Sequence, residues 1–142
     1  MRPKRSSVAM PEDERLLELA AVARSRAYAP YSGFPVGAAL AGVSGEIYLG
    51  CNVENAAYPA GICAERAALA AAIAAGERSF TRMVVLAGSD RPVPPCGICR
   101  QVIAELAPNM PLLLANLDGM LEETTPEALL PGAFRAQDIT GR

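Results

Sequence analysis

The stretch GICAERAALAAAIAAGE, residues 61–77, predicts an alanine-rich helix with chemically reactive residues at its start. Runs of alanine propagate helices well, so the helix itself is expected, with Gly76 as its C-cap. Its first turn is unusual, because Cys63 is followed two positions later by Glu65. A thiol and a carboxylate in one turn have a chemical use only if the rest of the chain supplies partners for Cys63.

Such partners lie in the stretch PPCGICR, residues 94–100, which carries Cys96 and Cys99 in a Cys-x-x-Cys spacing. Both stretches place cysteines at predicted helix starts, where the helix dipole and free backbone N–H groups favour thiolate over thiol. Thiolates bind zinc, and three protein ligands leave a fourth position for water, as in catalytic rather than structural sites. The sequence therefore predicts a catalytic zinc site formed by Cys63, Cys96 and Cys99.

Glu65 lies two residues beyond a predicted ligand, where it can reach a bound water without occupying the metal. Zinc lowers the pKa of such a water, and a nearby carboxylate can take its proton and pass it to a substrate. The pattern is that of zinc-dependent deaminases, ligand-x-Glu followed by Pro-Cys-x-x-Cys, in an all-cysteine version. Arg66, beside the site, is predicted to donate hydrogen bonds to the thiolates and to offset part of their charge.

Two other uses of the cysteines stay open. A Cys-x-x-Cys pair also occurs in redox dithiols, although prolines precede Cys96 here and no aromatic residue accompanies it. A closed structural zinc site would need Cys51 as its fourth ligand. Cys51 lies within a predicted strand, and free cysteines are often simply buried, so we expect it to pack there.

The composition excludes several classes of site and partner. The chain contains no histidine, so Ser-His-Asp sites, Cys-His sites and imidazole metal ligands are excluded. The net charge of -2, the absence of tryptophan and the presence of only three phenylalanines argue against a nucleic-acid partner. No apolar run reaches the roughly 20 residues of a membrane span, and the N-terminus lacks the apolar segment of a signal peptide. We therefore expect a cytoplasmic protein with no nucleic-acid or membrane partner.

The chain has 142 residues, of which 51% are hydrophobic, and this predicts one domain over residues 1–142 with flexible ends at 1–10 and 139–142. Apolar periodicity and turn residues predict the secondary structure. The predicted helices are residues 11–29, 61–77, 96–107 and a short segment within 124–134. The predicted strands are residues 36–42, 47–53, 82–88, 110–116 and 120–124, of which the first two form a hairpin. Strands that alternate with helices after a hairpin indicate one mixed, five-stranded sheet between helical layers.

Long strings of the chain resemble the small, homotetrameric cytidine deaminases over about residues 14–138. The strings that carry the resemblance are AYAPYSGFPVGAAL (27–40), GCNVENAAYP (50–59), CAER (63–66), PCGICRQVI (95–103) and EALLPGAF (127–134). The resemblance implies a three-layer α/β/α sandwich, one zinc ion per subunit and a homotetramer. It also implies that small nucleosides are the substrates, with cytidine and 2′-deoxycytidine hydrolysed to uridine and 2′-deoxyuridine and ammonia released, in pyrimidine salvage.

The resemblance also assigns roles to individual residues. It makes Cys63, Cys96 and Cys99 the zinc ligands and Glu65 the proton shuttle. The implied substrate contacts are Asn52 and Glu54 with the ribose hydroxyls, Phe34 with the pyrimidine ring, the backbone of Ala64 with the base, and Phe134.

Two of the implied contacts have simpler alternatives. Phe34 can instead cap the core from its loop, since burial is the commonest use of phenylalanine. Phe134 is implied to cover the site of a neighbouring subunit, with Tyr58 near subunit contacts, but it can instead anchor the tail on its own subunit.

Three other functions compete with cytidine deamination. A deaminase acting on a nucleoside antibiotic would share the zinc motif, although the NVEN and PGAF strings argue against it. A polynucleotide editor is disfavoured by the acidic charge and by short loops that offer no basic channel for a strand. A zinc-stabilised interaction module would explain the cysteines and leave Glu65 without a use.

Overall fold

The computed structural model describes residues 12–141, so the predicted flexibility of residues 1–10 falls outside this range. The helices are α1 (Asp13–Arg24), the 3-10 helix η2 (Tyr58–Ala60), α2 (Ala64–Ala74), α3 (Gly97–Leu106), α4 (Pro126–Leu129) and α5 (Ala136–Thr140). The strands are β1 (Val36–Gly42), β2 (Ile47–Cys51), β3 (Phe80–Ala87), β4 (Leu112–Asn116) and β5 (Leu121–Thr124). Across residues 12–141, no helix is both long and apolar enough to cross a membrane.

The five strands form one sheet in the order β2-β1-β3-β4-β5. β1 pairs antiparallel with β2, in the predicted hairpin, and with β3 on its other side. β5 is antiparallel to β4, whereas β3 and β4 are parallel and are connected through α3. The predicted mixed, five-stranded sheet is therefore confirmed.

One end of the sheet gathers the loops that carry the predicted site residues. Val36 at the start of β1 is paired with Ala87 at the end of β3, and Ala87 is paired with Asn116 at the end of β4. Gly37 is paired with Cys51, the last residue of β2. The loops that follow β2 and β3 and the loop that precedes β1 therefore all meet at this end.

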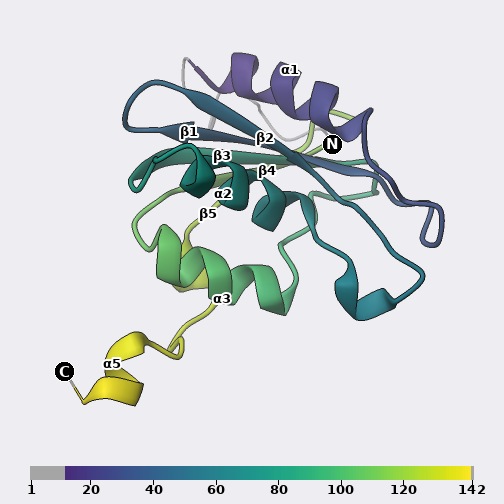
Figure 1. Cartoon of the computed structure of the whole chain (residues 1–142). Coiled ribbons are helices and arrows are strands. Elements are labelled where there is room, and N and C mark those ends of the chain that lie inside the picture. The colour runs from purple at the N-terminus through teal and green to yellow at the C-terminus, as the bar shows by residue number, and fades with distance from the viewer. Residues whose placement is uncertain (1–11, 142) are drawn as a thin grey trace.

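Helices cover both faces of the sheet, which gives the predicted three-layer α/β/α sandwich (Figure 1). α1 packs on one face, against residues that include Ala39, Val84 and Leu113. α2 and α3 pack on the other face, where the adjacent strand residues Leu40 and Met83 point. Because successive strand residues face opposite sides and both sides are covered, β3 and β4 are continuous apolar runs rather than alternating ones.

Two glycines let the helices approach the sheet closely. A Cβ added to Gly37 of β1 would lie 2.0 Å from the carbonyl oxygen of Ala20 in α1. A Cβ added to Gly50 of β2 would lie 2.2 Å from the carbonyl oxygen of Ala64, the first residue of α2. The backbone of α2 therefore rests directly on β2, and this contact sets the position of the helix start that carries Glu65.

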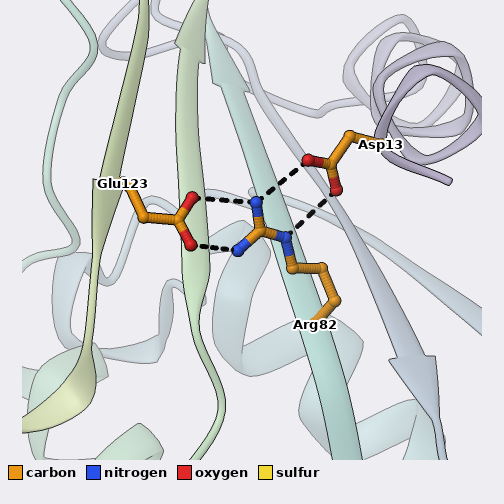
Figure 2. Close-up of polar contacts among 3 residues, drawn as sticks. All are labelled: Asp13, Arg82 and Glu123. Carbon is orange, nitrogen blue, oxygen red and sulfur yellow. Dashed lines mark hydrogen bonds and ion pairs between the residues drawn. The ribbon is translucent and has the colours of Figure 1, made fainter. Parts of the chain in front are cut away.

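A buried ion cluster joins α1 to the sheet (Figure 2). It lies at the end opposite to the site loops, because Arg82 is paired with Ala41 near the end of β1, whereas the site loops meet at Val36. Arg82 of β3 is 5% exposed, and it donates Nε to Asp13 Oδ1 at 3.1 Å and Nη2 to Asp13 Oδ2 at 3.0 Å. The same guanidinium donates to both carboxylate oxygens of Glu123 in β5, with Nη2 2.8 Å from Oε2. One arginine therefore ties the first turn of α1, a central strand and an edge strand together.

The predicted end of the first helix at residue 29 was wrong, because α1 ends at Arg24. Tyr28 instead joins the chain that continues β2: its N–H donates to the carbonyl of Asn52 at 3.0 Å, and its carbonyl accepts from Glu54 N at 2.8 Å. These bonds between distant segments replace the helical bonds that the local sequence favours.

The C-terminal tail, for which the sequence predicts no helix beyond residue 134, contains α5. The start of this helix is stabilised by a hydrogen bond of 2.8 Å from Arg135 N to Asp138 Oδ2. The helix extends away from the sandwich (Figure 1). It includes residues 139 and 140, whose predicted flexibility stays a prediction.

Candidate active site

Cys63 lies where the loop after β2 enters α2. It is the N-cap of that helix, in an extended conformation, and its carbonyl accepts a hydrogen bond from Ala67 N at 3.0 Å. Val53 and Ile62 exchange two backbone hydrogen bonds of 2.9 Å, which close the loop immediately before the helix. The backbone on both sides of Cys63 is therefore fixed.

Cys96 and Cys99 lie at the corresponding position of α3. Cys96 is the N-cap of that helix, and Cys99 is buried in its first turn. The Sγ atoms of Cys63 and Cys96 are 3.6 Å apart, and all three Sγ atoms lie within 4.8 Å of one another. Tetrahedral zinc with Zn–S bonds of about 2.3 Å requires sulfur–sulfur distances of about 3.8 Å. The cluster therefore fits one zinc ion per chain.

Cys51 does not belong to this cluster. It is the last residue of β2 and is half-buried. Within residues 12–141, the group of side chains able to hold a metal contains the other three cysteines only. Three ligands leave one tetrahedral position open, which is the arrangement of a catalytic zinc site rather than a closed structural one.

Two thiols of the cluster, Cys63 and Cys99, differ in acidity. A hydrogen bond from Cys99 lowers the pKa of Cys63 to about 5, with partial burial opposing the effect and Arg66 and Cys96 adding to it. The same hydrogen bond, together with burial, raises the pKa of Cys99. Cys63 is therefore a thiolate at neutral pH, which is the form that binds metal.

Arg66 supplies the positive charge beside this thiolate. Its Nη2 lies 3.7 Å from Cys63 Sγ, on the adjacent turn of the same helix. Its Nε is buried and makes no hydrogen bond within residues 12–141. The guanidinium is therefore held at the cluster through its Nη2 hydrogen bond to Cys63, and its positive charge offsets negative charge at the sulfurs.

Glu65 is the buried acid of the site. It is 5% exposed, and burial raises its pKa to about 7, with the negative charge of Cys63 contributing further. Its position two residues after Cys63 puts it in the first turn of α2. A carboxyl group that titrates near neutral pH can both accept and donate a proton, as a proton shuttle requires.

Asn52 and Glu54, the predicted ribose contacts, both bind the loop before β1. Asn52 accepts a hydrogen bond from Val36 N at 2.8 Å and donates one to the carbonyl of Phe34 at 2.9 Å. Glu54 accepts from the backbone N–H of Tyr31 and of Ser32, both at 3.0 Å, and from the Ser32 hydroxyl. Bonds from Ser32 lower the pKa of Glu54, so this carboxylate is ionised at neutral pH.

A cavity of about 370 Å³ adjoins Glu54. Its lining residues are Tyr31, Ser32, Glu54, Asn55, Tyr58 and Gly61. The rings of Tyr31 and Tyr58 meet edge to face, with centroids 5.8 Å apart. The volume of this cavity is in the range of small-molecule binding sites. One of its lining residues, Gly61, lies two residues before Cys63 in the chain. The cavity therefore brings together a carboxylate and aromatic rings beside the segment that leads into α2.

The remaining predicted contacts lie in different surroundings. Phe34 is 37% exposed, whereas Ala64 is fully buried at the start of α2. Phe134 is 59% exposed and lies in the C-terminal segment, where its carbonyl accepts a hydrogen bond of 2.8 Å from Gln101 Nε2. It lines a separate cavity of about 470 Å³ between α3 and that segment. Within one chain, the structure does not bring Phe134 to the cavity beside Glu54.

Comparison with known proteins places the three cysteines and Glu65 within a region that matches one protein family. The family model described as "Cytidine and deoxycytidylate deaminase zinc-binding region" matches residues 10–112, which include all three cysteines of the cluster and Glu65. This match spans more than half of the chain.

Individual proteins agree with the family match. A cytidine deaminase from Sporosarcina psychrophila is 52% identical over 128 residues, covering 89% of this chain and 94% of that protein. One from Halalkalibacterium halodurans is 49% identical, covering 89% of this chain and 96% of the relative. The crystal structure of cytidine deaminase from Burkholderia pseudomallei superposes with a TM-score of 0.83 at 48% identity, covering 85% of this chain and 98% of that one.

Proposed function

The chain belongs to the cytidine and deoxycytidylate deaminase family of zinc-dependent hydrolytic enzymes, and we propose that it converts cytidine and 2′-deoxycytidine to uridine and 2′-deoxyuridine with release of ammonia. One observation carries the proposal. Three cysteine sulfurs lie within 4.8 Å of one another, and the buried Glu65 stands two residues from one of them. The three sulfurs would bind a metal ion and leave one of its coordination positions open for water. Glu65 adds an acid that titrates near neutral pH.

In this proposal Cys63, Cys96 and Cys99 hold the zinc ion. Zinc bound there supplies a Lewis acid that makes water a good nucleophile at neutral pH. Arg66 offsets the charge of the three thiolates through its contact with Cys63.

Glu65 moves the protons of the reaction. It takes a proton from the attacking water and delivers it to N3 of the pyrimidine ring, while the oxygen adds to C4. The carboxylate then takes the second proton from the hydroxyl group on C4 and delivers it to the amine. The C4–N bond breaks as the C4 carbonyl forms, so one water is consumed and one ammonia leaves. Burial supports this role, because a carboxyl group with a pKa of about 7 loses and regains its proton readily at physiological pH.

The other predicted residues bind the substrate. Glu54 and Asn52 hold the ribose hydroxyls, and Phe34 packs against the pyrimidine ring, which receives hydrogen bonds from the backbone of Ala64. The cavity beside Glu54 and the ionised state of that carboxylate support the ribose assignment. A carboxylate and an amide hold a hydroxyl group through directional hydrogen bonds.

We further propose a homotetramer that acts in cytoplasmic pyrimidine salvage. Phe134 is exposed and lines a different cavity from the one beside Glu54 in its own chain, which supports its use at the site of a neighbouring subunit. Tyr58, which is 75% exposed, would lie near the same subunit contacts. All four cysteines are free thiols, as a reducing compartment allows.

A substrate panel tests the proposal. Zinc-loaded protein is incubated separately with cytidine, 2′-deoxycytidine, cytidine monophosphate and a cytosine nucleoside antibiotic, and ammonia release is measured. The proposal predicts rapid release from the two free nucleosides. Release from the antibiotic alone, or from none of the four, would contradict it.

A further inference from the structure

The first turn of α3 is held by contacts that the deamination chemistry does not use. Arg100 follows Cys99 directly, and its backbone N donates to the carbonyl oxygen of Cys96 at 3.0 Å. Its side-chain Nε donates to the carbonyl oxygen of Pro95 at 2.8 Å. One residue therefore bonds the two carbonyl groups on either side of the Cys96 α-carbon.

The same guanidinium reaches the C-terminal part of the chain. Arg100 Nη1 donates to the carbonyl oxygen of Leu129, the last residue of α4, at 2.8 Å. The side chain of Leu129 packs against the core between the sheet and α2 and α3. The neighbouring Gln101 donates to the carbonyl of Phe134. Two consecutive side chains of the ligand-bearing helix therefore hold the segment 129–134.

The geometry of arginine makes these contacts interdependent. A guanidinium is planar and rigid, and the directions of its N–H groups are fixed relative to one another. Arg100 therefore keeps both side-chain bonds only while the carbonyls of Pro95 and Leu129 hold one relative position. Pro95 is buried and directly precedes a metal ligand, so a shift of its carbonyl turns the peptide that orients Cys96. Partners of this kind, which hold metal ligands in place, affect metal retention strongly.

We propose that Arg100 is a positioning residue that couples the Cys96 side of the zinc site to the docking of the C-terminal segment, residues 126–134. The inference rests on the zinc site of the proposed function. It goes beyond that function by assigning a role to a residue that lies outside the metal-binding and substrate-binding sets. Because coupling free energies are reciprocal, bound zinc must stabilise the docked segment to the same extent that the segment stabilises bound zinc.

Two measurements on the full-length protein test the coupling. The first is the rate of zinc transfer to a chromophoric chelator. The second is amide hydrogen exchange at Leu129 and Leu130, whose N–H groups bond within α4 to Thr125 and Pro126, with and without zinc. The variants are Arg100→Lys, which keeps the charge and loses the planar fork, Arg100→Ala, and Gln101→Ala as the matched control.

The coupling predicts that zinc slows exchange at both amides in the wild type. Arg100→Lys and Arg100→Ala should release zinc roughly 10- to 100-fold faster and lose the zinc dependence of exchange. Gln101→Ala should release zinc at the wild-type rate, because Arg100 still bonds the carbonyl groups of both Pro95 and Leu129 in that variant.

The outcomes separate the inference from the site on which it rests. Exchange in the wild type that is independent of zinc would overturn the coupling, even if both Arg100 variants failed to fold. Folded Arg100 variants that release zinc at the wild-type rate would overturn the role of Arg100 alone. A wild-type protein that binds no zinc would overturn the zinc site as well.

Discussion

The buried position of Glu65 favours the proposed proton transfer but lowers the stability of the folded chain. Burial raises its pKa to about 7, so the carboxyl group can exchange protons at neutral pH. An exposed carboxyl group would be fully ionised there and a poor proton donor. The burial that would suit Glu65 to the proposed proton transfer therefore destabilises the folded chain whenever the group is ionised.

This conflict predicts that Glu65→Gln stabilises the zinc-free protein at about pH 8, by up to about 3 kcal/mol. With its raised pKa, the folded state holds the proton more tightly than the unfolded state does. The resulting stability is complete below about pH 4.5 and is lost as the pH rises through about 7. Urea titrations should therefore show the advantage of the variant shrinking as the pH falls. An advantage that grows toward acid pH would contradict this account.

Glu54 is predicted to recognise the ribose 3′-hydroxyl, and a substrate that lacks this group tests the contact. Hydrogen bonds to a charged group contribute about 1.5–3 kcal/mol, so the wild type should prefer 2′-deoxycytidine over 2′,3′-dideoxycytidine by roughly 10- to 100-fold in kcat/KM. Glu54→Gln should lose most of that preference. Glu46→Gln, at an exposed turn, serves as the control and should keep it. Full preference in Glu54→Gln would remove Glu54 from the ribose site.

At the scale of single residues, the sequence predicts chemistry that depends on residue type and spacing. Cys63, Cys96 and Cys99 are recognisable because their spacing, with Glu65 two residues after Cys63 and a proline before Cys96, matches the zinc deaminase pattern. The partners of Glu54 were not predictable, because backbone N–H groups of a distant loop supply them. The bonds of Arg100 were missed for the same reason, since both acceptors of its side chain are backbone carbonyls whose positions no residue type encodes.

At the scale of elements, the cluster of Arg82, Asp13 and Glu123 connects α1 with β3 and β5 (Figure 2). Arg82→Met would leave the fully buried Asp13 without this charge partner, and removal of one member of a buried ion pair typically costs about 3–5 kcal/mol. Urea denaturation at fixed protein concentration should show this loss. The kcat of the refolded variant should stay unchanged, because the cluster lies at the opposite end of the sheet from the cysteines.

The matched control is Glu123→Gln. The side chain of Glu123 is 37% exposed, so water can replace part of its interaction and the loss of stability should be about 1 kcal/mol or less. Equal losses of stability in Arg82→Met and Glu123→Gln would show that the unpaired charge of Asp13 is not the main cost of removing Arg82.

Helices and strands were predicted correctly where a local sequence pattern determines them, and incorrectly where a contact with a distant segment overrides that pattern or the pattern is absent. The apolar runs of β3 and β4 identified strands covered on both faces, and the alanine-rich stretch identified α2. The end of α1 was mispredicted because Tyr28 bonds to the chain after β2, and local helix preference does not report such a bond. α5 was missed because its residues, 136–140, are all exposed and show no apolar periodicity.

At the scale of the whole molecule, zinc would join two helices that pack on the sheet side by side, since Cys63 begins α2 and Cys96 begins α3. A ligand that binds only the folded state stabilises it by mass action. Chelation should therefore lower the melting temperature by about 10 °C, for a contribution of about 3 kcal/mol. Calorimetry with and without chelator measures the change, and an unchanged melting temperature would contradict the zinc site.

Cysteine variants separate the three-ligand site from a four-cysteine site. Cys51→Ser should retain one zinc ion per chain, because Cys51 lies outside the cluster. Cys96→Ser should lose most of the bound zinc. Elemental analysis of the purified proteins distinguishes the two, and loss of zinc in Cys51→Ser would point to a closed structural site.

The most direct test of the account follows the ultraviolet absorbance of cytidine in the presence of zinc-loaded wild type and zinc-loaded Glu65→Gln. We expect the wild type to shift the spectrum to that of uridine. The variant should keep the fold and one zinc ion per chain while its turnover falls roughly 100- to 10,000-fold. A zinc-loaded variant that deaminates cytidine at the wild-type rate would contradict the role of Glu65. A zinc-loaded wild type that leaves the spectrum unchanged would contradict cytidine deamination itself.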